Sequence, residues 1–356
     1  MNLQELLKAQ IQFNASDLIL KAASPPIMRI NGELKLMDMP PLTKVDIESE
    51  FVKLLTKKQV EEYQVSFELD FSYEMPSGAR FRVNLFKQRG TLGGVFRKIP
   101  GKIPTIDELM LPPILKEMAM RPRGLIVVTG PSGCGKTTTM AALIHHRNTH
   151  DTCHIVTVED PVEFIHKNVQ AIVTQREVGR DTHSFANALK YVLRQDPDVI
   201  LVGEMRDLET IQLAITAAET GHLVVTTLHT SDSISTIDRI VDVFPPHQQN
   251  QIRMQLSLNL LFIISQDLLT RADGAGRVAA YEILIATPSL RNLIREAKTY
   301  QISSILQTSQ QAGMIAFDAC LANFVRRGVV TQEEAEYKAL NHDAFHKEMK
   351  QTAEAQ

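Results

Sequence analysis

The sequence is poor in cysteine and has no long apolar run. Its three cysteines, Cys134, Cys153 and Cys320, are scattered, and no C-x-x-C pair typical of a zinc site is present. Isolated cysteines are typical of free thiols in a reducing cytosol. No stretch approaches the length of a membrane-spanning helix, and residues 1–8 lack the basic and apolar regions of a signal peptide. We therefore expect a cytoplasmic protein that reaches a membrane only through partners.

A strong charge imbalance, internal repeats and low-complexity tracts are also missing. The formal net charge is −3, which gives no electrostatic reason to bind nucleic acid or an anionic membrane. The content of hydrophobic residues is 44%, as in ordinary soluble domains. A chain of 356 residues is long enough for two domains with sizeable cores.

Residues 1–98 carry the pattern of a small α+β domain. Apolar residues at helical spacing over 3–11 predict an amphipathic helix, and a capping box at Thr56–Gln59 predicts another. Asn31-Gly32 predicts a hairpin turn. Strands are predicted at 16–20, 27–30, 67–73, 79–85 and 92–98.

A break in the pattern at residues 99–112 predicts a linker, because Pro100, Gly101 and Pro104 interrupt it. Residues 113–356 then form the second predicted domain. Two short helices are expected over 105–120. Apolar strands recur at 124–129, 155–158, 171–174, 199–202 and 223–227.

Helical stretches between most of these strands predict a mostly parallel sheet covered by helices. Beyond residue 231 the pattern is mainly helical, with a strand pair expected near 262–269 and 277–285. A capping box at Thr331–Glu334 predicts a further helix.

The glycine-rich turn after the strand at 124–129 fits the phosphate-binding pattern. Glycines let backbone N–H groups curl around a phosphate, and the following helix directs its positive end at the same anion. Lys136 is expected to reach the β- and γ-phosphates, and Thr137 to ligate Mg²⁺. The predicted nucleotide contacts of this loop are Gly130, Ser132, Gly133, Cys134, Gly135, Lys136, Thr137 and Thr138.

A second apolar strand ends in Gly203-Glu204. In phosphate-loop enzymes such a strand lies beside the loop and delivers an acid to Mg²⁺ or its waters. The commoner pattern has Asp at the position of Gly203, so we expect Glu204 to act through water. The alternative is a solvated carboxylate at a strand end.

Acids and histidines follow two other predicted strands. Glu159, Asp160 and Glu163 form a cluster that could orient an attacking water, although acids in loops are usually solvated. His222 and His229 bracket a strand, which puts them at opposite ends and on opposite faces. They make a poor metal pair. We expect polar contacts to phosphate or to a neighbouring subunit, with a structural role the alternative for each.

These motifs, in this order and spacing, resemble the PilT family of type IV pilus retraction ATPases, within the secretion ATPase superfamily. Gln175–Gly179 and Leu193–Val199 match the family too. Ser289–Glu296 is close to the signature Ala-Ile-Arg-Asn-Leu-Ile-Arg-Glu of retraction motors. The resemblance covers nearly the whole chain. It implies an α/β protein with a PAS-like N-terminal domain, a RecA-like ATPase domain with a helical C-terminal region, and a hexameric ring with ATP between the domains.

The resemblance also implies roles for the acids and histidines. Glu163 would position the hydrolytic water, and Glu204 would be the Walker B acid. His222 and His229 would be the histidine-box residues. Mg²⁺ would be bound by Thr137 and Glu204.

Two arginines of the N-terminal domain, Arg82 and Arg97, resemble family arginines that reach the nucleotide. The alternation in the strand at 79–85 puts Arg80 and Arg82 on the face opposite Phe81 and Val83. The alternative is a solvated basic face of the sheet.

The activity implied is ATP hydrolysis that drives pilus retraction and twitching motility. The implied partners are five further copies of the chain, an inner-membrane platform protein and other pilus-base components, with neither nucleic acid nor membrane insertion. A pilus-extension or type II secretion ATPase is disfavoured because the usual extra N-terminal region and four-cysteine zinc module are missing. An accessory nucleotide-binding subunit stays open, since Ser289-Leu290 replaces Ala-Ile. A DNA-translocating relative is disfavoured by the charge balance.

Cys134 stands where the family often has Ser. A helix N-terminus and Lys136 nearby favour the thiolate, so we predict that a maleimide labels it unless nucleotide is bound. The alternative is a buried, inert thiol.

In the 289–296 segment, helical spacing puts Leu290, Leu293 and Ile294 on one face. We expect that face to pack in the domain. Arg291 and Arg295 lie on another face, and we expect them to couple hydrolysis to retraction.

Overall fold

The computed structural model describes residues 2–30, 32–99, 101–308 and 313–351, so Asn31 of the predicted hairpin turn lies outside the described residues. The chain divides into two compact units, each described here by itself. The N-terminal unit comprises Met1–Lys102 and Pro161–Ile165, and the C-terminal unit comprises Ile103–Asp160 and His166–Gln356. The linker at 99–112 stays a prediction.

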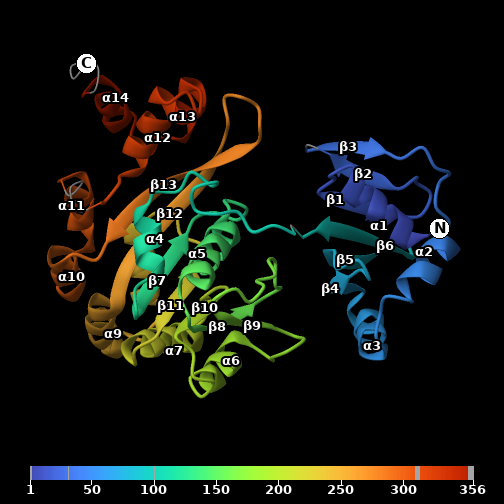
Figure 1. Ribbon diagram of the computed structural model, residues 1–356, viewed down its shortest axis with the longest axis horizontal. Coiled ribbons are helices and arrows are strands. Elements are labelled where there is room, and N and C mark those ends of the chain that lie inside the picture. Colours follow the sequence, from blue (N-terminus) through green and yellow to red (C-terminus); the bar gives the residue numbers. More distant parts are fainter. Residues whose placement is uncertain (1, 31, 100, 309–312, 352–356) are drawn as a thin grey trace. The chain divides into compact units, whose positions relative to one another are not determined.

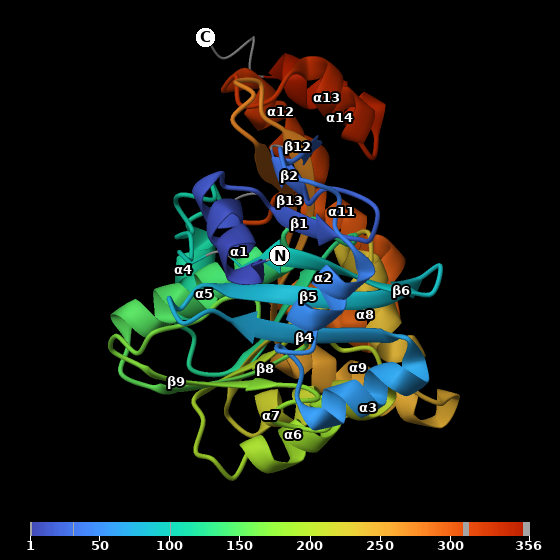
Figure 2. The same cartoon turned by 90° about the vertical axis from the view of Figure 1, so that its right-hand side faces the viewer.

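The N-terminal unit is built on a six-stranded sheet in the order β3-β2-β1-β6-β5-β4, in which every neighbouring pair is antiparallel. Strands of this sheet are labelled in Figure 2. The five predicted strands are confirmed, whereas β3 and α2 were not predicted. Its elements are α1 (Leu3–Gln12), β1 (Asp17–Leu20), β2 (Ile27–Ile30), β3 (Glu33–Leu36), α2 (Lys44–Phe51), α3 (Lys57–Ser66), β4 (Glu68–Glu74), β5 (Arg80–Gln88) and β6 (Thr91–Lys98).

One face of this sheet is apolar because its strands alternate. In β5 the residues Phe81, Val83 and Leu85 are fully buried, and they belong to a core cluster that also contains Leu7 of α1 and Phe51 of α2. The other face carries polar side chains, as predicted for this strand. The capping box at Thr56 is complete, with Thr56 and Gln59 bonded to each other's backbone N–H.

The C-terminal unit is built on a seven-stranded sheet in the order β13-β12-β7-β11-β10-β8-β9, shown in Figure 1. All neighbours are parallel except the β12–β13 pair. Its elements are α4 (Ile114–Ala119), β7 (Gly124–Thr129), α5 (Lys136–His150), β8 (His154–Glu159), β9 (Ile172–Glu177), α6 (Phe185–Val192), β10 (Val199–Val202), α7 (Leu208–Glu219), β11 (Leu223–Thr227), α8 (Ser233–Asp242), α9 (Pro246–Asn259), β12 (Leu260–Thr270), β13 (Arg277–Ile285), α10 (Pro288–Arg295), η1 (Thr299–Gln301), α11 (Ile302–Thr308), α12 (Phe317–Arg326), α13 (Gln332–Lys338) and α14 (His342–Gln351).

Helices cover both faces of this sheet, which explains why β7 is buried at every position. Ile126 and Val128 belong to one core cluster, with side chains of α4, α5 and α12. Leu125 and Val127 belong to a second cluster, with side chains of α6, α7 and α9. The predicted parallel sheet and the predicted strand pair are thus confirmed.

Two local predictions are wrong. Residues 105–120 contain one helix, α4, rather than two. Thr105 and Glu108 do bond to each other's backbone N–H, but Pro112 and Pro113 follow closely, and proline stops a helix. The predicted capping box at Thr331 is half formed: Thr331 accepts from Glu334 N, while the Glu334 carboxylate accepts from Thr270 N.

Among the described residues, no helix combines the length and the apolar character that crossing a bilayer requires.

Candidate active site

The functional side chains of the C-terminal unit gather at one edge of its sheet. Strands β7, β8, β10 and β11 are parallel, so their carboxyl ends meet at the same edge. The glycine-rich loop follows β7 there. Glu159 ends β8, Glu204 lies just past β10, and His229 lies just past β11. Four motifs that are far apart in sequence are therefore brought together by strand direction.

The loop after β7 has the backbone conformation of a phosphate cradle. Gly130, Gly133 and Gly135 have positive φ angles of 139°, 78° and 93°, which side chains with a Cβ rarely adopt. Gly135 is the N-cap of α5, and the first N–H groups of a helix have no partner within it. Ser132 and Gly133 are exposed. Backbone donors at this helix N-terminus are thus available to an anion.

Lys136 places a buried cation at the loop. Its side chain is held over the loop because Nζ donates to Gly130 O at 2.8 Å and to Pro131 O at 2.9 Å. Burial lowers the pKa of Lys136, and the nearby Glu204 carboxylate opposes that shift. A buried ammonium held by neutral acceptors is compensated better when a phosphate lies beside it, which fits the predicted contact.

Glu204 and His229 face this lysine. His229 Nδ1 lies 3.5 Å from Lys136 Nζ, and its Nε2 lies 3.6 Å from Glu204 Oε2. Burial lowers the pKa of His229, and the Lys136 ammonium lowers it further, so its imidazole is neutral near pH 7. Arg206 was missed from the sequence; its Nε forms an ion pair with Glu204 Oε1 at 2.8 Å.

The strand that delivers Glu204 is not the immediate neighbour of the loop strand in the sheet. β11 lies between β7 and β10. Thr227 at the end of β11 donates its hydroxyl to Gly203 O at 2.6 Å, which ties the Glu204 turn to the intervening strand. The separation leaves room at the edge for His229 between the acid and Lys136.

His222 does not belong to the phosphate site of its own chain. Its carbonyl accepts from Gly124 N, at the start of β7, at 3.0 Å, whereas the phosphate loop follows the end of that strand. Its Nδ1 lies 2.9 Å from Ala217 O. Our expectation of a phosphate contact is therefore wrong within one chain, and the neighbouring-subunit alternative stays a prediction.

A threonine network that the sequence did not reveal fixes the loop that carries His229. Thr129, the last residue of β7, accepts from Thr230 N at 3.1 Å. The hydroxyls of Thr129 and Thr230 are 2.7 Å apart, and Thr230 shares a 2.6 Å contact with Thr236 of α8. Because Thr230 follows His229 directly, this network sets the position of the imidazole relative to the phosphate loop.

The three acids Glu159, Asp160 and Glu163 do not share one environment. Glu159 is buried and accepts from Thr157 Oγ1 at 2.6 Å and from Gln175 Nε2 at 3.2 Å. Asp160 is exposed. Glu163 lies in the segment assigned to the N-terminal unit. The role of Glu163 toward an attacking water stays a prediction.

Arg82 and Arg97 lie opposite each other on neighbouring strands of the N-terminal sheet. They belong to a row of residues across its polar face that continues to Asp17 and Arg29. Arg97 Nε donates to the buried Asp17 Oδ1 at 2.8 Å, yet the Arg97 side chain is still 67% exposed. The predicted face is confirmed for Arg82, while contact of either arginine with nucleotide stays a prediction.

Cys134 lacks the thiolate character that we expected from its position. The residue is 2% exposed. Burial raises the pKa of its thiol, and Lys136 lowers it to a smaller extent. The alternative of a buried, inert thiol is therefore favoured, because desolvation disfavours the charged form.

The helix α10 contains the segment expected to couple hydrolysis to retraction. Leu290 and Ile294 are fully buried, as predicted. Arg291 instead contributes to the fold: its guanidinium donates to Leu258 O at 2.6 Å, to Leu260 O at 2.9 Å and to Ser257 O. These carbonyls lie at the end of α9 and the start of β12, where a helix leaves its acceptors unpaired.

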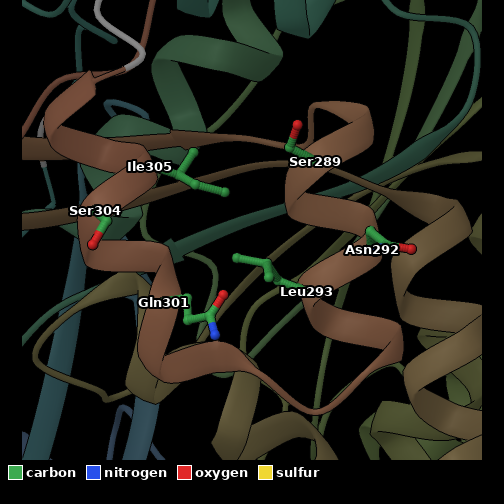
Figure 3. Close-up of a pocket in the computed structure, with 6 residues that line it drawn as sticks. All are labelled: Ser289, Asn292, Leu293, Gln301, Ser304 and Ile305. Atoms are coloured by element: carbon green, nitrogen blue, oxygen red, sulfur yellow. The ribbon is translucent and has the colours of Figure 1, made fainter.

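A cavity of about 440 Å³ lies between α10 and the helical turns that follow it. Figure 3 shows Leu293 of α10 and Ile305 of α11 pointing into the space between the two helices. The remaining lining residues are Ser289, Asn292, Gln301 and Ser304. Leu293 is partly buried and packs against the core cluster that contains Leu290 and Ile294, as predicted, and it also lines this cavity.

A glycine-rich loop with a buried lysine, at the carboxyl edge of a parallel sheet, defines a phosphate-loop nucleotide-binding protein. Residues 110–275 match the family model described as "Type II/IV secretion system protein". The chain is 48% identical to the "Type IV pilus retractation ATPase PilT" of Pseudomonas aeruginosa, over 95% of this chain and 98% of that protein. The chain belongs to the PilT family of secretion ATPases, as predicted.

Two further relatives support this assignment. The "Type IV pilus ATPase PilU" of Pseudomonas aeruginosa is 40% identical over 94% of this chain and 88% of that protein. The crystal structure of the pilus retraction motor PilT with bound ADP superposes with a TM-score of 0.91, at 43% identity, over 98% of this chain and 99% of that one. The predicted fold class, an N-terminal α+β domain followed by a RecA-like ATPase domain, is confirmed.

Proposed function

We propose that this chain is a motor that hydrolyses ATP to retract type IV pili. The observation that carries the proposal is the meeting of Lys136, His229 and Glu204 at one edge of the sheet, in a chain 48% identical to a retraction ATPase. Identity to the "Type IV pilus ATPase PilU" is lower, at 40%, so the retraction ATPase is the more similar of these two relatives.

The phosphate loop would hold the β- and γ-phosphates, with Lys136 leaving its two loop carbonyls for phosphate oxygens. Thr137 lies in the first turn of α5 and would supply a hydroxyl to Mg²⁺, with Glu204 reaching the ion through water. Among the described residues no group of three or more acids, histidines or cysteines could hold a metal by itself. That fits an ion held largely by phosphates and water. Mg²⁺, when bound, neutralises charge on the phosphates.

The neutral imidazole of His229 lies between Lys136 and Glu204. It would therefore hydrogen-bond the γ-phosphate of ATP or the phosphate released from it. Glu163 would orient the attacking water, and Arg82 and Arg97 would reach phosphate oxygens with their planar donor forks. These three residues belong to the N-terminal unit, and their roles follow from the family resemblance. The chain would work as a homohexameric ring at the pilus base.

The partners would be an inner-membrane platform protein and other pilus-base components, met from the cytoplasmic side. Contact through the surface around α10 and α11 would explain why a cavity with polar rims and two aliphatic side chains lies there. The exposed Arg295 would belong to this contact, while Arg291 would hold α10 in place.

The proposal is tested with the purified protein and with cells. The protein should release phosphate from ATP only with Mg²⁺, and cells lacking the gene should carry excess pili and not twitch. Glu204→Ala should fail to restore motility, while wild type should restore it. Cells that lack pili altogether would favour an extension motor. A protein that binds ATP without turnover would favour the accessory subunit.

A further inference from the structure

Strand β12 extends past the end of its parallel neighbour β7. Ser265 pairs with Thr129, the last residue of β7, while β12 continues to Thr270. Residues 266–270 still pair with β13 on one side but have no partner in β7 on the other, where Gln266 lies against the phosphate loop. The first of them, Gln266, is 2% exposed.

The Gln266 side chain hydrogen-bonds to the phosphate loop and to the helix that follows it. Its Nε2 donates to Cys134 O at 2.7 Å. Its Oε1 accepts from Thr139 Oγ1, in the first turn of α5, at 2.9 Å. One primary amide thus joins the middle of the loop to the helix that follows it, and both of its ends are used.

The backbone of Gln266 fixes the start of the same loop. A Cβ on Gly130 would lie 2.2 Å from the Gln266 carbonyl oxygen, so only glycine allows the loop to leave β7 this close to β12. Gly130, Cys134 and Thr139 all pack against one residue of a strand that follows the loop by more than a hundred positions.

We propose that Gln266 is a positioning residue for nucleotide binding, which holds the phosphate loop open before ATP arrives. The amide fixes the Cys134 carbonyl away from the anion, so the neighbouring N–H groups of the loop are directed at phosphate. Such preorganisation lowers the entropy cost of binding. The proposal concerns nucleotide affinity and rests on the proposed function only where turnover is measured.

The first test is Gln266→Glu, which keeps the size and the acceptor but exchanges the donor for an oxygen. A carboxylate cannot donate to Cys134 O, so the Kd for ADP should rise about tenfold at pH 8, as expected for one lost buried hydrogen bond. Lowering the pH to 6 should recover much of that loss, because a buried carboxyl protonates readily and then donates again. Wild-type affinity should change about twofold or less over this range.

Turnover gives a second readout. The loop cradles phosphate in the ground state and in the transition state alike, so weaker preorganisation should raise KM for ATP and change kcat less. If ATP proves not to be hydrolysed at all, the proposed function fails, while the ADP measurement still tests Gln266.

A double-mutant cycle of Thr139 and Gln266 isolates the hydrogen bond between their side chains. Thr139→Val removes the hydroxyl donor and should raise the Kd for ADP about threefold, whereas Thr139→Ser should restore it. In a Gln266→Leu background, Thr139→Val should have no further effect, because interacting residues are not additive.

A matched control is Gln10→Leu in the N-terminal unit. Gln10 is also fully buried, and its Nε2 also donates to backbone carbonyls, those of Ser16 and Phe96. Its loss should lower the unfolding temperature and leave ADP affinity unchanged. Gln266→Glu that lowers the unfolding temperature as Gln10→Leu does, with unchanged affinity and no pH effect, would overturn the proposal.

Discussion

The two sheets of this protein present polar side chains in different ways. The antiparallel sheet of the N-terminal unit is covered by its core on one face, so its arginines lie along the other face, where alternation exposes every second residue. The mostly parallel sheet of the C-terminal unit is buried on both faces. The acids, the histidine and the phosphate loop that we assign to its site therefore lie at or just past strand ends. A face can be predicted from one strand, whereas an edge depends on the order of all the strands.

The largest expected effect is a loss of turnover from a change at the carboxyl edge of the C-terminal sheet. Glu204→Gln should retain ADP binding and lose turnover by about 10³-fold, since it removes a charge that acts on Mg²⁺ and water. Phosphate release and nucleotide binding measure the two effects. Glu209→Gln, an exposed acid of the following helix, is the control. Turnover within a factor of about 3 of wild type would exclude Glu204 from the mechanism.

The two histidines at opposite ends of β11 test which end of that strand belongs to the phosphate site. His229→Ala should lower turnover about 10²-fold because the imidazole lies between Lys136 and Glu204. His222→Ala should lower it far less in a single-chain site. Equal losses would mean that His222 reaches the phosphate site of a neighbouring subunit, which size-exclusion chromatography of both variants would help to resolve.

Arg291 and Arg295 compare a structural with an exposed arginine on one helix. Arg291→Ala should lower the free energy of unfolding by about 2 kcal/mol, because it leaves carbonyls of α9 and β12 unpaired. Arg295→Ala should leave stability and turnover unchanged while reducing twitching. Urea unfolding followed by circular dichroism checks the first part. Equal stability of both variants would favour our first expectation, that Arg291 couples hydrolysis to retraction.

The polar face of the N-terminal sheet is tested by Arg82→Ala. If this arginine reaches phosphate, turnover should fall about tenfold while ADP binding persists. Arg97→Ala also removes an ion-pair partner from the buried Asp17, as does Arg29→Ala in the same row of the sheet. Arg29→Ala is therefore the matched control for Arg97→Ala. Normal turnover in Arg82→Ala would make the solvated face the correct interpretation.

The smallest effect is one of pH. Burial lowers the pKa of His166 to about 4, below the value of about 6.5 in the unfolded chain. The folded state therefore disfavours protonation, and stability present above pH 6.5 is lost as the pH falls toward 4. The free energy of unfolding should drop by about 1 kcal/mol between pH 7 and pH 5.5. His166→Gln should flatten that dependence, and an unchanged slope would assign the pH effect to other groups.

The strands and the phosphate loop were predictable because their signals are local. An unbroken apolar run predicts a strand buried on both faces, and the glycines with Lys136 and Thr137 specify an anion cradle by their spacing alone. Alternation in β5 likewise predicted which arginines share a face. Elements with weaker signals, such as β3, whose residues are all exposed, were missed.

What only the tertiary structure decided is how distant segments meet. The insertion of β11 between β7 and β10 could not be predicted from either strand, because strand order leaves no mark on local pattern. The parallel direction of β7 and β11 puts His229, rather than His222, at the edge where Lys136 lies. Burial of Cys134 depends on packing around the loop, and it reversed the effect that the helix end and Lys136 alone predicted. Short-range chemistry thus came from the sequence, while desolvation and long-range neighbours came from the fold.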